Sequence, residues 1–185
     1  MEIEVVYGAI VVPVCRENDG GQVWILLQRR NDPGPEGIDH GRLGVMSETF
    51  NPALDSNTFA TGIRGCREEF CLPELAVDLI GRDGALAYLL KHDLDQPDQI
   101  ANPYSSYHGQ RVDASGRVLS LHAENYVAIF GEKIVPQANE EAYGFEWVRL
   151  CDMPERLWHP EDFTFTYMSL REICNDLIAG RLKFR

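Results

Sequence analysis

The chain has 185 residues, of which 44% are hydrophobic and 25% are charged. This length fits one globular domain, and the composition supports a buried core without disulfide or metal cross-links, which excludes disordered, collagen-like and mini-protein classes. The 29 acidic residues outnumber the 17 Lys and Arg residues and give a net charge of −12. Broad binding to a nucleic-acid duplex needs clustered cations and is disfavoured, whereas a small anionic substrate would need a divalent metal to mediate its binding.

The N-terminal sequence and the cysteines indicate the compartment. The longest early apolar run, residues 5–15, is too short to span a bilayer, and Glu2 and Glu4 precede it in place of the cations of a secretory signal. We therefore expect a soluble, cytoplasmic protein with no membrane partner. No two cysteines form a C-x-x-C pair, so we expect reduced thiols in packed positions. The alternative is that one of them is a reactive nucleophile. The five are Cys15, Cys66, Cys71, Cys151 and Cys174.

The first elements of the chain predict a β-hairpin. Residues 3–14 are rich in β-branched side chains on both alternating faces, which is typical of a central strand covered on both sides. The turn sequence Asn18-Asp19-Gly20-Gly21 connects it to a second apolar strand over residues 23–28. Residues 31–41 predict an irregular surface loop, and a short apolar segment follows at residues 43–46.

A helix is predicted next. N-cap candidates at residues 56–58 precede a periodic segment that reaches about residue 71. Four apolar residues recur at spacings of four, three and four, so they share one helix face that we expect in the core: Phe59, Ile63, Cys66 and Phe70. Pro73 lies just beyond and would end the helix.

The second half of the chain predicts further strands and a closing helix. Residues 75–90 fit either a strand or a helix. Residues 91–116 form a long polar stretch with Tyr104, Tyr107 and His108, for which a substrate-facing lid and an ordered surface insertion remain open. Strands are predicted over residues 121–130 and 145–150, and an amphipathic helix over residues 163–179. This order predicts an α+β fold with a layered, mixed sheet.

The most informative motif is the segment Arg64-Gly65-Cys66-Arg67-Glu68-Glu69-Phe70-Cys71-Leu72. An acidic helix face can bind Mg²⁺ through its carboxylate oxygens, because side chains three and four residues apart project to one side. Such a cation shields the charge of a diphosphate, lowers the pKa of an attacking water and steadies the leaving oxygen. A solvated acidic surface paired with Arg64 and Arg67 is the alternative.

This segment resembles the signature helix of the Nudix hydrolase family, which reads R-E-U-x-E-E-x-G-U with U a bulky aliphatic residue. Matching positions are held by Arg64, Glu68, Glu69 and Leu72, and Cys66 stands at the first U. The resemblance extends to a strand ending in Leu-Leu-Gln-Arg-Arg, a late strand over residues 126–130, a Glu-Glu pair before the strand at residue 145, and Asp-Met-Pro at residues 152–154. It accounts for most of the 185 residues.

The resemblance implies a Nudix-like α/β/α sandwich with a mixed β-sheet between helices. It implies one domain over residues 1–185, with insertions near residues 47–57 and 91–116. It also implies Mg²⁺, or Mn²⁺ in its place, held by Glu68, Glu69 and Glu140, with Arg64 holding Glu68 by an ion pair. The resemblance makes Glu69 the principal ligand, and the catalytic residues it implies are Glu68, Glu69 and Glu141.

Other residues have two interpretations. Arg29 and Arg30 end a strand and are expected to bind substrate phosphate by bidentate hydrogen bonds, whereas strand-end arginines that only face water are the alternative. Glu140 and Glu141 lie where the family supplies a further ligand or a general base, and an ordinary charged loop is the alternative.

The motif departs from the family pattern at several positions. Gly65 stands where the first Glu is expected, so one metal ligand is absent, and Cys71 replaces the usual Gly. Glycine inside a helix costs about 1 kcal/mol relative to alanine, which suggests close packing or lost function at this position. The start of the motif, Gly44 and Glu48, is separated from Arg64 by extra residues, and Glu48 is a candidate for the missing carboxylate.

Two functions follow from the resemblance. The first is a Mg²⁺-dependent hydrolase that cleaves the pyrophosphate bond of a nucleoside diphosphate linked to another group. The second is a Nudix-fold ligand-binding or regulatory protein that has lost turnover, which Gly65 and the stretched motif favour. A purely structural interaction domain is a third alternative. The expected partners are a small nucleotide derivative and a second copy of the chain in a homodimer, and the sequence does not indicate which substrate is used.

Overall fold

The computed structural model describes residues 3–17, 21–31, 39–70, 78–80, 86–89, 103–112 and 115–182. Its strands are β1 (Glu4–Arg16), β2 (Val23–Arg30), β3 (Leu43–Gly44), β4 (Met46–Thr49), β5 (Asp78–Ile80), β6 (Leu86–Leu89), β7 (Ser105–Val112), β8 (Val118–Phe130) and β9 (Ala142–Arg149). Its helices are α1 (Thr58–Phe70), α2 (Met153–Arg156) and α3 (Tyr167–Ile178), with short 3₁₀ turns at Leu150–Asp152 and Pro160–Asp162.

The described strands form one mixed sheet in the order β3-β2-β1-β8-β5-β6, with β4 added to β1, β7 to β8 and β9 to β2. β1 and β8 run parallel along almost their whole length, and the other pairs are antiparallel. The predicted pairing of the first two strands and the central place of β1 are confirmed, because β1 lies between β2 and β8.

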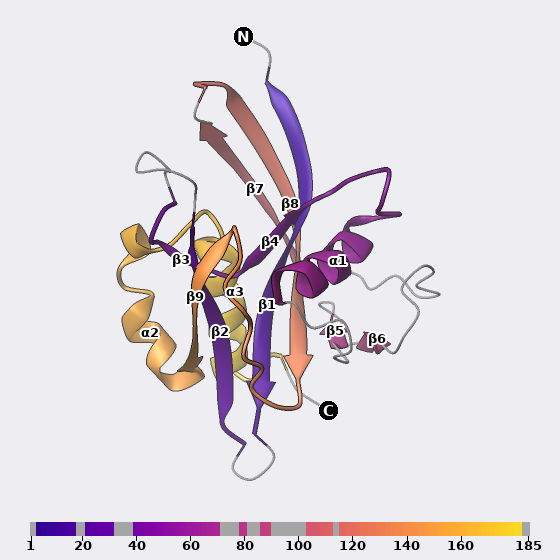
Figure 1. The fold of residues 1–185 in the computed structure, drawn as a ribbon. Helices are drawn as coiled ribbons and strands as arrows, with labels where there is room; N and C mark the ends of the chain where they lie inside the picture. The colour runs from indigo at the N-terminus through magenta and orange to yellow at the C-terminus, as the bar shows by residue number, and fades with distance from the viewer. Residues whose placement is uncertain are drawn as a thin grey trace.

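Two apolar layers cover opposite faces of this sheet. Alternate residues of β1 separate between them, with Ile10 and Val12 in one cluster and Ala9 and Val11 in the other. The first cluster includes the buried face of α3, and the second includes the predicted face of α1. α1 therefore lies on one side of the sheet and α2 and α3 lie on the other, which is the expected helix-sheet-helix sandwich (Figure 1).

The structure corrects the prediction for part of residues 91–116. Residues 105–112 form β7, which pairs with β8 from Ser105 to Val112, so this part is not a lid; it is ordered, as the alternative expected, but as a strand of the sheet. Tyr104 is 4% exposed and donates a hydrogen bond to Asp176 of α3. Because β7 is an outer strand whose side chains are partly exposed on both faces, it lacks the apolar alternation by which strands are recognised. Residues 91–102 lie outside the described residues.

Three smaller differences concern element boundaries and a thiol. The described parts of residues 75–90 are the strands β5 and β6. The closing helix begins at Tyr167 and not at residue 163, because Phe163 pairs with Leu43 of β3 and holds the preceding segment against the sheet. Cys151 is exposed, contrary to the expectation of packed thiols, whereas Cys15, Cys66 and Cys174 are buried. Cys71 and Pro73 lie outside the described residues.

Within the described ranges, no helix has both the length and the apolar character that crossing a membrane requires.

Candidate functional site

Glu69 is the most unusual charged residue of the described chain. It lies in the last turn of α1, it is 3% exposed, and neither carboxylate oxygen has a hydrogen-bond partner among the described residues. Burial raises the pKa of this carboxyl to about 8, Arg30 and the neighbouring Gln28 amide oppose the rise, and Glu141 adds to it. A buried carboxylate without a partner is costly unless a cation or a proton neutralises it. Glu69 is therefore a candidate ligand for a cation.

Strand β2 and the segment before β9 supply the groups around Glu69. Gln28 is 2% exposed and its Oε1 has no hydrogen-bond partner among the described residues. Arg30 forms an ion pair with Glu141 at 3.3 Å between Nη1 and Oε2. The Arg30 side chain is 18% exposed and that of Glu141 is 51% exposed, and both act electrostatically on Glu69. The structure thus brings three of the predicted residues together: Glu69, Arg30 and Glu141.

Asn139 fixes this segment to α1. Its Nδ2 donates to the carbonyl oxygen of Glu69 at 3.2 Å, and its Oδ1 accepts the backbone N–H groups of Glu141 and Ala142 at 2.8 Å. The sequence analysis missed Asn139 and Gln28. A polar residue at the end of the apolar run of β2 was the available signal for Gln28, and an Asn directly before the Glu-Glu pair was the signal for Asn139.

Arg64 connects α1 to the segment that precedes it. Its Nε and Nη2 donate to the two oxygens of Asp55 at 2.9 and 2.8 Å, in a bidentate pair. It also contacts Glu48 at 3.2 Å and Glu68 at 3.1 Å, and Nη2 donates to the carbonyl oxygen of Thr49 at 2.9 Å. The predicted ion pair between Arg64 and Glu68 is therefore present, and the Glu68 side chain is 57% exposed.

Asp55 was not predicted, yet it is the strongest partner of Arg64. Its side chain is 2% exposed. Burial alone would raise the pKa of this carboxyl, but hydrogen bonds from Arg64, Asn51 and Thr61 hold it below its usual value. Asp55 therefore stays ionised and fixes the Arg64 guanidinium, while the Arg64–Glu68 contact lies nearer to solvent.

Gly65 is a glycine because of close packing between α1 and β4. A Cβ at this position would lie 2.7 Å from Sδ of Met46 and 2.8 Å from Cβ of Glu48, so there is no space for a side chain. Glu48 thus lies beside the position where the family pattern has its first Glu. Burial raises the pKa of the Glu48 carboxyl, Arg64 opposes the rise and Glu141 adds to it. This geometry favours Glu48 as the replacement for the absent carboxylate.

We expect Gly65→Ala to destabilise the protein by about 1–3 kcal/mol, the cost of overpacking, despite the higher helix propensity of alanine. Gly62→Ala is the matched control in the same helix, because its Cβ would meet Val11 Cγ2 at 3.3 Å, a contact that a small shift relieves. Chemical denaturation of both variants measures the difference. Equal midpoints for Gly65→Ala and the wild type would show that α1 and β4 are not packed this closely.

Two predicted residues lie apart from this group. Arg29 donates to the carbonyl oxygen of Gly41 at 2.7 Å and not to a carboxylate of the site. Glu140 is exposed, and its backbone carbonyl accepts a hydrogen bond from Asn31.

The oxygen donors suit a hard cation. Within the described ranges no three His, Cys, Asp or Glu side chains are close enough together to hold a metal ion as they stand. Glu48 and Glu141 nevertheless act electrostatically on Glu69, so each of them raises the pKa of its carboxyl. Carboxylate oxygens are the ligands that Mg²⁺ and Mn²⁺ prefer. The residues that could hold such an ion are thus Glu69 together with Glu48 or Glu141.

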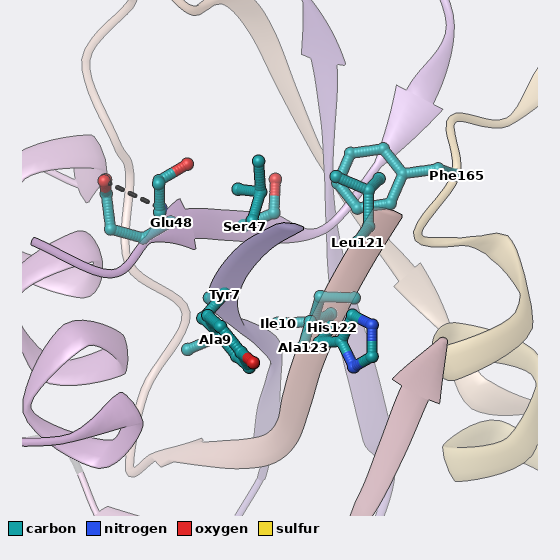
Figure 2. A pocket seen from close by; sticks show the side chains of 12 residues that line it. Tyr7, Ala9, Ile10, Ser47, Glu48, Leu121, His122, Ala123 and Phe165 are labelled. Carbon is teal, nitrogen blue, oxygen red and sulfur yellow. Dashed lines mark hydrogen bonds between the residues drawn. The ribbon is translucent and has the colours of Figure 1, made fainter. Parts of the chain in front are cut away.

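A cavity of about 60 Å³ borders β4 on the side of Glu48 (Figure 2). Its walls come from β1, β4 and β8, and Phe165 closes it from the segment before α3. Gly8 lies in its wall, where a Cβ would come within 2.5 Å of the carbonyl oxygen of Glu48. The cavity is too small for a nucleotide as it stands, and of the acidic residues around Glu69 only Glu48 lines it.

Solved structures resemble the chain over nearly its whole length. The Nudix hydrolase RenU from M. smegmatis has a TM-score of 0.58 at 12% identity, with 98% of this chain and 91% of that chain covered. The NUDIX domain of Shewanella oneidensis NrtR, complexed with ADP ribose, has a TM-score of 0.55 at 13% identity over 96% of this chain and 90% of that chain. A C. elegans Ap4A hydrolase has a TM-score of 0.55 at 15% identity over 96% of this chain and 99% of that chain.

No protein-family model matches the chain, and no curated protein sequence matches it. The likeness therefore concerns the fold, and the expected fold class is confirmed: the chain has a Nudix-like fold, with a mixed sheet between helices.

Proposed function

We propose that the protein is a Mg²⁺-dependent hydrolase that cleaves the diphosphate bond of a nucleoside diphosphate linked to another group. The single observation that supports this most is the Glu69 carboxylate, buried without a hydrogen-bond partner among the described residues, in the helix that resembles the Nudix signature. A protein retains such a costly group where a ligand neutralises it. Two solved neighbours, the ADP-ribose complex and the Ap4A hydrolase, point to substrates of this chemical class.

Each charged residue then has a distinct role. Glu69 is the principal metal ligand, and Glu48 and Glu141 are candidates for completing the ligand set. The bound ion, Mg²⁺ or Mn²⁺, would shield the diphosphate charge and lower the pKa of the attacking water. Arg30 steadies a phosphate oxygen once its ion pair with Glu141 opens. Glu68 contributes to the acidic face while its contact with Arg64 orients it.

Glu141 is also the candidate general base. It is half exposed, and it lies in the segment that Asn139 fixes to α1, so it can accept a proton from a water near the diphosphate. Glu140 is its neighbour in sequence but has no described contact with the group around Glu69. This difference separates two carboxylates that the sequence alone does not distinguish.

The first test measures turnover on a substrate panel. ADP-ribose, diadenosine tetraphosphate and nucleotide sugars are incubated with the protein in Mg²⁺, in Mn²⁺ and in excess EDTA, and released mononucleotides are separated by anion-exchange chromatography. We expect release from at least one substrate in the presence of metal and none in EDTA. Release that continues in EDTA would contradict the metal requirement.

A pair of variants tests the loop carboxylates. We expect Glu141→Gln to lower kcat by about 100-fold or more, the usual loss for a general base, while KM changes little. Glu140→Gln is the matched control and should retain wild-type kcat. A larger loss for Glu140→Gln than for Glu141→Gln would reverse the assignment.

A binding protein without turnover is the second candidate. The observation that favours it is Gly65, because Met46 and Glu48 fill the space of the absent carboxylate. Calorimetry with ADP-ribose distinguishes the two functions. Binding together with no product at any Mg²⁺ or Mn²⁺ concentration would select the binding protein and contradict the hydrolase.

A further inference from the structure

We propose that His108 and His122 form a second cation site, for a borderline divalent ion such as Zn²⁺, Ni²⁺ or Cu²⁺. They lie on β7 and β8, which pair with each other along β7, while the start of β1 pairs with β8 on its other side (Figure 1). None of the carboxylates of the candidate active site comes from these strand segments. The histidine pair is thus separate from Glu69, although His122 and Tyr7 also line the cavity that borders Glu48.

The register of the two strands brings the imidazoles together. His108 and His122 are directly opposite each other in the antiparallel pair of β7 and β8, so their side chains lie on the same face of the sheet. Their Nδ1 atoms are 3.0 Å apart, and the rings are perpendicular with centroids 4.6 Å apart. Two ring nitrogens that face each other at this distance need either a shared proton or a cation between them.

The separation of the two nitrogens fits metal coordination. With metal–nitrogen bonds of about 2.0–2.1 Å, two neighbouring ligands of one ion lie about 2.9–3.4 Å apart for square or tetrahedral angles. The 3.0 Å between the two Nδ1 atoms falls in this range, so an ion could bind with little rearrangement. Imidazole nitrogen favours Zn²⁺, Ni²⁺ and Cu²⁺ over Mg²⁺, which prefers oxygen.

Neighbouring side chains orient His122. Ser120 Oγ lies 3.1 Å from its Nε2, and a ring that donates its Nε2–H to this hydroxyl presents the lone pair of Nδ1 to His108. The Tyr7 ring packs against His122 with centroids 5.5 Å apart, which restricts its rotation. Figure 2 shows Tyr7 and His122 on the same side of the strands. His108 is exposed, so the remaining coordination positions are open to water.

The test is a calorimetric titration with Ni²⁺ alone of the protein with its cysteines reduced. We expect one equivalent to bind to the wild type, and we expect His108→Ala and His122→Ala to abolish this binding. Ser120→Ala should weaken binding by about tenfold, the usual cost of removing the partner of a ligating imidazole. His159→Ala is the matched control, because the exposed His159 ring pairs with Glu161 and lies near no other histidine of the described residues, and this variant should bind Ni²⁺ as the wild type does.

A second readout follows the two imidazoles directly. In NMR spectra, Zn²⁺ should shift the ring protons of His108 and His122 and leave those of His159 unchanged. His108 and His159 are exposed and His122 is half-buried, and equal melting temperatures confirm that the variants remain folded. Equal Ni²⁺ binding by the wild type and the two histidine variants would overturn the proposal. No binding of Ni²⁺ to the wild type at about 1 mM, which corresponds to a Kd weaker than about 1 mM, would also overturn the proposal. It would show that the two imidazoles share only a proton.

Discussion

Glu69→Gln should make the metal-free protein more stable at pH 8 and should abolish metal-dependent hydrolysis. The Glu69 carboxyl has a pKa of about 8 in the folded protein, against 4.5 in its ordinary state, because it is buried. Between these two pH values the folded protein binds a proton that the unfolded chain releases. Raising the pH through this range therefore lowers the stability of the wild type, and the neutral glutamine of the variant removes this loss.

The size of the effect follows from the pKa shift. At 1.36 kcal/mol per pKa unit, the rise from 4.5 to about 8 corresponds to about 4–5 kcal/mol, so we expect the variant to exceed the wild type by up to about this amount at pH 8 in EDTA, with little difference at pH 4.5. The new amide can also donate to Gln28 Oε1, a buried acceptor that has no hydrogen-bond partner among the described residues. Urea denaturation measures the difference in free energy of unfolding between the variant and the wild type at pH 8 and at pH 4.5.

Mg²⁺ should narrow the difference in stability between the two proteins. At a concentration 100 times its Kd, a ligand that binds only the folded state adds about 2.7 kcal/mol, and only the wild type can gain this if Glu69 is the ligand. In the hydrolysis assay with Mg²⁺, the wild type should turn over substrate and the Glu69→Gln variant should not, although the variant is the more stable protein in EDTA. A variant that is less stable than the wild type in EDTA at pH 8, or that hydrolyses substrate normally, would contradict the role of Glu69.

The fold could be predicted where burial imposes a periodic pattern. The apolar faces of β1 and α1 are visible in the sequence because both elements are packed against a core. β7 could not be predicted, since an outer strand with partly exposed faces is free to carry residues such as Ser105, His108 and Gln110. Local spacing similarly predicted the contact between Arg64 and Glu68, which are one helical turn apart.

The rest of the site depends on contacts that no local pattern encodes. Asp55 reaches Arg64 because the segment before α1 folds back against the helix, and Asn139 reaches the carbonyl oxygen of Glu69 across 70 residues of sequence. Gly65 combines a feature that the local sequence predicts with one that depends on long-range contacts. The sequence predicted close packing there, but only the register of β4 against α1 identifies Met46 and Glu48 as the residues that occupy the space.

Arg64→Ala should destabilise the protein by about 3 kcal/mol at pH 7. The main reason is Asp55, whose side chain is 2% exposed and would lose both hydrogen bonds of the bidentate pair. Removing one partner of a buried ion pair leaves a charge without compensation, which costs more than the pair itself contributes. Glu48 would lose a partner as well. Arg64→Lys should recover only part of the loss, because an ammonium group cannot form the two parallel hydrogen bonds.

The pH dependence distinguishes this explanation from a general loss of packing. The pKa of Asp55 lies below its ordinary value of 3.8 in the folded protein, so the pair contributes stability above pH 3.8 that is lost as the pH falls through the lowered pKa. The difference between the wild type and Arg64→Ala should therefore narrow in acid. Arg67→Ala is the matched control, since Arg67 is exposed on the same helix and its loss should change the free energy of unfolding little. A difference that stays constant from pH 7 to pH 3 would mean that Arg64 stabilises α1 through the packing of its aliphatic chain and not through Asp55.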